Sequence, residues 1–138
     1  MRQNVLEILR GLLYETIDVG APDSTPVDYP DIAEEVASMV SNGTVDRGIL
    51  ICGTGIGMSI AANKFPGVRA APVPDEMLAD ISRRHNDLNV LCLPADMMST
   101  YTLERVVKKW LETAFDGGRH ARRIEKITEI ERKNGMRK

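Results

Sequence analysis

Residues 48–64 read Gly-Ile-Leu-Ile-Cys-Gly-Thr-Gly-Ile-Gly-Met-Ser-Ile-Ala-Ala-Asn-Lys, and this stretch decides the fold. Its first five residues form a continuous apolar run of strand length, which is typical of a strand covered on both faces in a parallel sheet. Glycines at positions 53, 55 and 57 follow, and the residues up to Ala62 suit a helix. The stretch therefore predicts a strand, a tight glycine turn and a helix, the first part of a βαβ unit.

The same alternation continues on both sides of this stretch. Helical spacing of apolar residues predicts helices near residues 5–12, 31–41, 75–85, 102–114 and 119–132. Short apolar or β-branched runs predict strands at 16–20, 68–71 and 89–93, and the Pro- and Asp-rich residues 21–30 predict a loop. Strands that alternate with helices imply a parallel sheet with helices on both faces. We expect one α/β domain over residues 1–138, with ligands at the carboxyl ends of its strands.

Composition excludes several classes of function. The formal net charge of the 138 residues is −2, with both signs mixed, so nothing favours binding to nucleic acid or to an acidic membrane. No apolar run reaches the roughly eighteen residues of a membrane helix, and no secretory leader is recognised. The two cysteines, Cys52 and Cys92, lie in apolar runs without CxxC spacing. We therefore expect reduced thiols and a cytoplasmic protein.

The glycine turn places Cys52 beside several backbone N–H groups. Because glycine has no Cβ, these groups can converge on an anion or on a developing oxyanion, and the start of the next helix adds partial positive charge. The same field favours the thiolate form of a cysteine placed there. A lone cysteine in an apolar run is ordinarily a packing residue, but its position directly before three glycines favours a reactive role.

Three familiar glycine loops do not fit this turn. A dinucleotide-binding loop needs a third glycine where Met58 stands, although Asp75 lies where its ribose-binding acid would be. A P-loop needs Gly-Lys-Ser or Gly-Lys-Thr, which does not follow Gly57. A thiol phosphatase would hold its phosphate with an arginine after the loop, where Met58 and Ser59 stand. A nucleotide-binding module is therefore the last of the alternatives.

Four blocks of the sequence resemble ribose-5-phosphate isomerase type B. They are residues 46–64, Val27-Asp28-Tyr29-Pro30, Arg84-His85-Asn86-Asp87 with Asn89-Val90-Leu91, and Gly117-Gly118-Arg119-His120 with Arg122-Arg123. The resemblance runs from about Ile17 to Arg132. It implies a three-layer α/β/α sandwich with a parallel, Rossmann-like sheet. It also implies a homodimer or a dimer of dimers, with each site assembled between two subunits.

The resemblance also implies roles for individual residues. Cys52 would be the base that moves a proton between C1 and C2 of the open-chain sugar, and His85 the proton donor that helps to open the furanose ring. Arg119 and Arg123 match phosphate-binding arginines, and their spacing of four places them on one helical face, where they can grip a phosphate together. The implied substrate-binding residues are Gly53, Thr54, Gly55, Ile56, Gly57, Asn86, Arg119 and Arg123.

One feature of that family is missing from the sequence. Family members begin with a strand that ends in an Asp-His pair contacting the substrate, and this strand lies between those corresponding here to residues 16–20 and 48–52. No Asp-His pair occurs in the chain. The resemblance therefore implies a missing first strand, two missing substrate ligands and weak turnover.

The favoured function is an isomerase of the pentose phosphate pathway that interconverts ribose 5-phosphate and ribulose 5-phosphate through an enediolate. One alternative is an isomerase for a six-carbon aldose phosphate of the galactose or allose type. Another is a non-catalytic homologue that only binds a sugar phosphate. Proton transfer through an enediolate needs no redox cofactor. Two histidines far apart in the sequence, without clustered acids, suggest no metal site, so we expect neither a cofactor nor a metal.

Overall fold

The computed structural model describes residues 1–20 and 26–135. The elements, in chain order, are α1 (Arg2–Gly11), α2 (Tyr29–Ser41), β1 (Gly48–Cys52), α3 (Ile56–Ala62), β2 (Ala70–Pro72), α4 (Glu76–Asn86), β3 (Val90–Pro94), the short 3₁₀ helix η1 (Ala95–Met97), α5 (Thr100–Glu112) and α6 (Arg119–Lys133). Every predicted helix is present, and so are three of the four predicted strands. The predicted loop over residues 21–30 lies partly outside the described residues.

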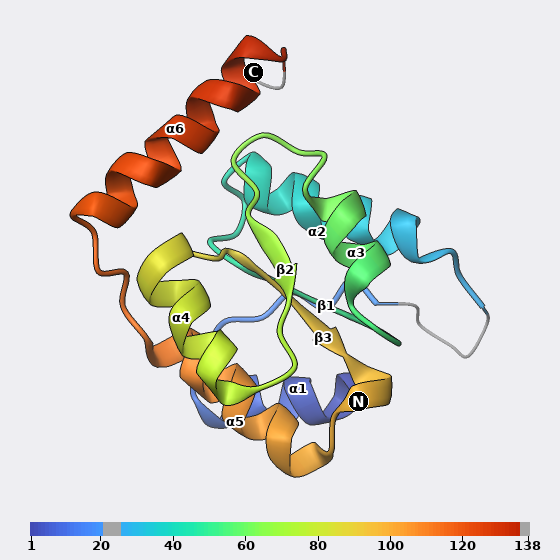
Figure 1. Cartoon of the computed structure of the whole chain (residues 1–138). Coiled ribbons are helices and arrows are strands. Elements are labelled where there is room, and N and C mark those ends of the chain that lie inside the picture. Colours follow the sequence, from blue (N-terminus) through green and yellow to red (C-terminus); the bar gives the residue numbers. More distant parts are fainter. Residues whose placement is uncertain (21–25, 136–138) are drawn as a thin grey trace.

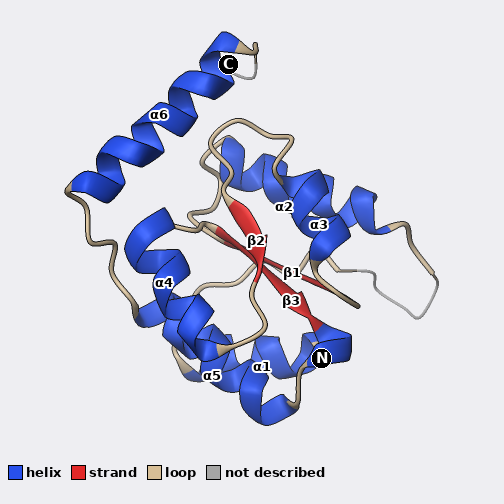
Figure 2. Ribbon diagram, in the orientation of Figure 1, coloured by secondary structure: helices blue, strands red, loops and turns tan. Residues whose placement is uncertain are grey.

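The three strands form one parallel sheet in the order β1-β3-β2 (Figures 1 and 2). In the register of β1 and β3, Gly48 pairs with Val90 and Cys52 pairs with Pro94. All five residues of the central strand β3 are buried. The continuous apolar run that predicted a doubly covered strand is therefore explained by its position between two strands and two helical layers.

Helices cover both faces of the sheet, which confirms the predicted three-layer α/β/α arrangement. Leu91 and Leu93 of β3 pack into a core with residues of α1, α4 and α5. The alternate residues Val90 and Cys92 pack into a second core with residues of α2 and α3. Because successive side chains of a strand point to opposite faces, one strand supplies both cores.

The predicted strand over residues 16–20 is wrong. These residues form no strand, and Ile17 is 59% exposed. In the described part of the chain β1 has no partner on its outer edge, and a groove of about 830 Å³ runs along that edge, lined by Ile49, Ile51 and residues 14–20 among others. A strand is stabilised by hydrogen bonds to a neighbouring strand, so residues 16–19, three of which are β-branched, form a loop where no such neighbour is described.

The last helix extends away from the body of the molecule (Figure 1). Of the residues in α6, only His120 in its first turn is buried. Ile127 and Ile130 further along are 44% and 59% exposed. Near its end, Glu131 accepts a hydrogen bond from the Gly67 N–H at 2.9 Å, but α6 still presents much of its apolar face to solvent. Among the described residues no helix is long and apolar enough to cross a membrane.

Candidate active site

Cys52 is the last residue of strand β1 and lies where the carboxyl ends of the strands meet, at the carboxyl edge of the sheet. Its side chain is half-buried and packs toward the core shared with α2 and α3. The Gly55 N–H donates a hydrogen bond to the Cys52 sulfur, with a nitrogen–sulfur distance of 3.2 Å. The turn therefore already directs an N–H group at the atom predicted to be the base.

The other cysteine is placed very differently. Cys92 lies in the middle of β3 and is fully buried. Burial, with a smaller contribution from the nearby Cys52, raises the pKa of the Cys92 thiol to about 12. This thiol is neutral at physiological pH, so Cys52 is the candidate nucleophile or base of the pair.

The glycines of the turn are required by its shape. Gly55 precedes α3 with φ +78°, a left-handed conformation that strains other residues. A Cβ on Gly55 would also lie 2.9 Å from Cβ of Pro72, and a Cβ on Gly57 would lie 2.6 Å from the ring of Tyr29. These two glycines thus allow close packing against neighbouring residues, and Gly55 allows the turn itself. We call residues 52–57 the Cys52 loop.

The loop uses some of its own donors internally. Besides the bond from Gly55 to the sulfur, the Ile56 N–H donates to Thr54 Oγ1 at 3.2 Å. Sequence reasoning treated every N–H group from Gly53 to Gly57 as a donor for substrate. In this conformation the N–H groups of Gly53, Thr54 and Gly57 are the remaining candidates.

Two further side chains lie against the Cys52 loop, and sequence reasoning gave neither a role. Tyr29, at the start of α2, is 47% exposed and has its hydroxyl oxygen 2.9 Å from the position of a Cβ on Gly57. Asp96 of η1 places a carboxylate oxygen 2.6 Å from the position of a Cβ on Gly53. The available signals were the Asp-Tyr-Pro block for Tyr29 and, for Asp96, its place just beyond the carboxyl end of β3.

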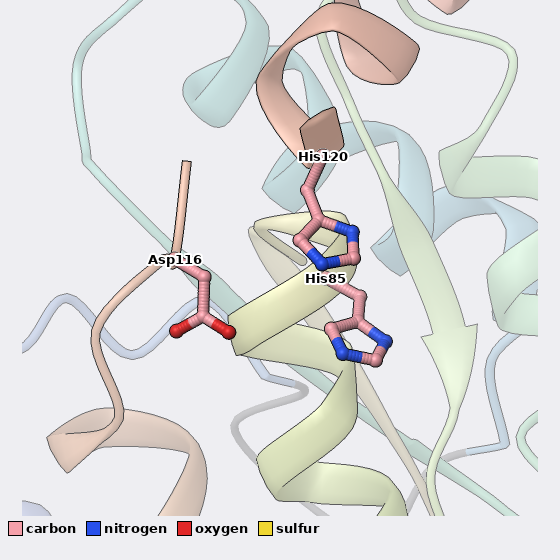
Figure 3. Close-up of side chains that lie close together, drawn as sticks. All are labelled: His85, Asp116 and His120. Atoms are coloured by element: carbon pink, nitrogen blue, oxygen red, sulfur yellow. The ribbon is translucent and has the colours of Figure 1, made fainter. Parts of the chain in front are cut away.

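A second group of predicted residues lies where α4 ends and α6 begins. His85 of α4 and His120 of α6 stack with ring centroids 4.2 Å apart and an interplanar angle of 11°, beside Asp116 (Figure 3). The exposed Arg119 and Arg123 flank His120 on α6. The exposed Asn86 is the last residue of α4. We call His85, Asn86, Arg119, His120 and Arg123 the α4–α6 cluster.

His120 is the member of this cluster to which the sequence assigned no role. It is 9% exposed and holds α6 against α4 through its contact with His85. Burial lowers the pKa of His120 below its ordinary value, and the nearby His85, Arg119 and Arg123 lower it further, while Asp116 opposes the change. The imidazole of His120 is therefore predominantly neutral at physiological pH.

The two histidines and Asp116 also form a group of potential metal ligands. Their ligand atoms all lie within 4.8 Å of one another, although the two histidines are far apart in the sequence. However, an imidazole binds a metal through a nitrogen lone pair in the plane of its ring, and two nearly parallel stacked rings direct their lone pairs alongside each other. The arrangement in Figure 3 is a stacking contact and is not shaped for a shared ion.

The Cys52 loop and the α4–α6 cluster lie at opposite ends of the parallel strands, which we call the carboxyl edge and the amino edge of the sheet. Cys52 pairs with Pro94 at the carboxyl edge. The carbonyl of Asn86 accepts a hydrogen bond from Arg69 Nε, just before β2 begins, so α4 ends at the amino edge. A strand rises about 3.3 Å per residue, so the two edges are roughly 13 Å apart. The fold does not bring Cys52 and His85 of one chain together.

The sequence matches the model of a family described as Ribose/Galactose Isomerase over residues 1–127. It is 47% identical over 119 residues to "Ribose-5-phosphate isomerase B" of Escherichia coli strain K12, which covers 86% of this chain and 80% of that protein. It is also 47% identical over 135 residues to a putative sugar phosphate isomerase of Bacillus subtilis strain 168, covering 97% and 91% of the two chains.

Solved structures agree with these sequence relationships. The ribose-5-phosphate isomerase B of Clostridium thermocellum superimposes with a TM-score of 0.93 and 46% identity, covering 96% of this chain and 90% of that one. The corresponding enzyme of Mycoplasma genitalium, solved with bound ribulose-5-phosphate, has a TM-score of 0.88 and 40% identity, with coverages of 94% and 87%.

Proposed function

The chain belongs to the ribose/galactose isomerase family, and from this premise we propose that it interconverts ribose 5-phosphate and ribulose 5-phosphate. The observation that carries the proposal is the Cys52 loop, in which a half-buried cysteine at a strand end receives a hydrogen bond from the following glycine turn. Such a loop suits a reaction that needs a base and donors for a developing oxyanion side by side.

The proton transfer uses the sulfur and the backbone of the Cys52 loop. The Cys52 thiolate removes the proton from C2 of the open-chain aldose, and the electron pair moves through the C1–C2 bond to give an enediolate. N–H groups of the loop hold the negative oxygen while a proton passes from O2 to O1. The thiol then returns its proton to C1 as the electron pair on O2 forms the C2 carbonyl, which completes the ketose. Removing one such donor typically costs about 10²–10³ in rate, so the loop contributes to the chemistry as well as to binding.

The α4–α6 cluster handles the other end of the substrate. Arg119 and Arg123 are four residues apart and exposed on α6, so both guanidinium groups are available to a phosphate dianion. His85 opens the furanose ring by moving a proton to and from the ring oxygen, and Asn86 donates a hydrogen bond to a sugar hydroxyl. All four residues lie at the amino edge of the sheet.

A complete site therefore requires two copies of the chain. A pentose phosphate cannot reach from Cys52 to the amino edge on the far side of the same sheet, because the strands between them span roughly 13 Å. In a two-fold dimer, the Cys52 loop of one protomer can face the α4–α6 cluster of its partner, and the symmetry forms two equal sites. The exposed Ile127 and Ile130 on α6 give the dimer an apolar surface to bury.

The two alternatives from the sequence are less well supported. A six-carbon substrate is not favoured, because the relatives that carry a specific name are ribose-5-phosphate isomerases B, one of them solved with ribulose-5-phosphate. A non-catalytic binding protein would have no need of a backbone donor aimed at the Cys52 sulfur. The isomerase proposal accounts for both the loop and the cluster.

The direct test is a steady-state assay of ribose 5-phosphate isomerisation with the purified chain, beside allose 6-phosphate and unphosphorylated ribose. We expect turnover of ribose 5-phosphate, little of the six-carbon phosphate and almost none of ribose. Tight binding of ribose 5-phosphate without any turnover would support the binding homologue instead.

A further inference from the structure

Asp96 carries a negative charge at the Cys52 loop, where the proposed function alone gives it no task. Its backbone N–H donates to the Gly53 carbonyl at 3.0 Å, which fixes η1 against the start of the loop. Its carboxylate oxygen Oδ2 lies only 2.6 Å from where a Cβ of Gly53 would be. The carboxylate is therefore held over the residue next to Cys52, where only a glycine leaves room for it.

This carboxylate is not neutralised within the chain. Asp96 is exposed, and no lysine or arginine in residues 1–20 and 26–135 forms an ion pair with it. A second anion brought to the Cys52 loop would meet uncompensated repulsion. A sugar hydroxyl would instead find a strong acceptor, because a carboxylate accepts hydrogen bonds from neutral donors.

We propose that Asp96 is a specificity-determining residue, which accepts a hydrogen bond from a hydroxyl of the sugar and repels anionic groups from Cys52. This inference rests on the proposed function and adds a rule for the substrate. The end of the molecule that reacts at Cys52 must be uncharged and hydroxylated, and its single phosphate must lie at Arg119 and Arg123 of the partner. Sugar bisphosphates and sugar acids with a carboxylate at C1 are excluded by charge.

The first experiment measures charge at Cys52 without any substrate. Iodoacetamide and iodoacetate both alkylate a thiolate with loss of iodide, but only iodoacetate is anionic. Their second-order rates at Cys52, followed by mass spectrometry, give a ratio that cancels the reactivity of the sulfur itself. In Asp96→Asn we expect the iodoacetate rate to rise about two- to fivefold relative to the iodoacetamide rate at low ionic strength.

The matched controls separate local charge from net charge. Asp46→Asn removes the same charge just before the opposite end of β1, and we expect its ratio to match the parent. Asp96→Glu keeps the charge and should also match the parent. An unchanged ratio in Asp96→Asn, or an equal rise in Asp46→Asn, would overturn the proposal.

The second experiment tests the substrate rule with 5-phosphoribonate, in which a carboxylate replaces the aldehyde. In Asp96→Asn we expect this sugar acid to inhibit more strongly while KM for ribose 5-phosphate rises, whereas a structural defect would weaken both. Equal changes for the two molecules would overturn the rule. Absence of isomerisation by the parent would overturn the proposed function, but the alkylation ratio would still report whether Asp96 controls charge at Cys52.

Discussion

The Cys52 loop and the α4–α6 cluster are built in different ways. The loop is built from backbone: Gly55 and Gly57 permit close packing, and an N–H group is aimed at the sulfur. The cluster is built from side chains, with exposed arginines on a helix whose buried residue is His120. Proton transfer needs fixed geometry, whereas a phosphate can be held by long, adaptable cations. The proposed function would therefore place the reacting end on the rigid sheet and the binding end on a projecting helix.

The sharpest test of this division is to remove the base. Cys52→Ala should lower kcat by about 10²–10⁴-fold, because general-base catalysis contributes that much, while KM changes little. The variant Cys92→Ala is the control, since it removes a buried thiol that takes no part in the chemistry. It should lower Tm and leave kcat near that of the parent. Near-normal turnover by Cys52→Ala would remove Cys52 from the mechanism.

Mixing two impaired variants, assayed at a ribose 5-phosphate concentration near the parent's KM, tests whether the regions meet between protomers. Cys52→Ala and the double variant Arg119→Ala/Arg123→Ala each damage every site of their own dimers. After co-expression, half of the dimers are mixed and carry one intact site, so about a quarter of the parent activity should return. Failure of the mixture to exceed its components, with mixed dimers verified by mass, would place both regions in one protomer.

The phosphate arginines should affect binding more than turnover. Losing Arg119 or Arg123 removes a charge-assisted hydrogen bond worth about 1.5–3 kcal/mol, so KM for ribose 5-phosphate should rise roughly ten- to a hundredfold. Arg122→Ala, also exposed on α6 but at a different angle around the helix, should behave like the parent. If none of these variants changes KM, α6 is merely a solvated basic helix.

The outer edge of β1, which no strand of residues 1–20 and 26–135 covers, offers a way to stabilise the sheet that carries the Cys52 loop. A chain extended before Met1 by an apolar strand that ends in Asp-His should pair with β1 and fill the groove of about 830 Å³. Burying even one or two apolar side chains contributes about 1.5–3 kcal/mol each, so Tm should rise on the order of 5 °C. Turnover should rise as well, and a polar extension of equal length should change neither quantity.

The smallest effect concerns the stack that positions α6. Because folding lowers the pKa of His120, the unfolded chain binds a proton more readily than the folded one. The contribution of neutral His120 to stability is therefore full above about pH 6.5 and declines as the pH falls through the lowered pKa. Tm of the parent should show this decline, and His120→Phe, which keeps a stacking ring, should lack that component. Identical Tm profiles would contradict the prediction.

The sequence by itself determined the local elements and the chemistry of the loop. The apolar run 48–52, the glycines that follow and the helical spacing further on depend on neighbours in the chain, so their strand, turn and helices could be predicted. The matching sequence blocks identified the family as well. The predicted strand at residues 16–20 failed because β-branched residues form a strand only beside a partner, and in the described residues no strand pairs there.

Tertiary structure decided every feature that depends on residues far apart in the sequence. The stack of His85 on His120 and the carboxylate of Asp96 over Gly53 join residues 35 and 43 positions apart, and no local periodicity encodes such contacts. The separation of Cys52 from the α4–α6 cluster is equally invisible in the sequence, because it follows from parallel strands whose connecting helix runs back to the opposite edge. The sequence supplied the candidate residues, and the sheet determined that one copy of the chain holds Cys52 and His85 at opposite ends of its strands.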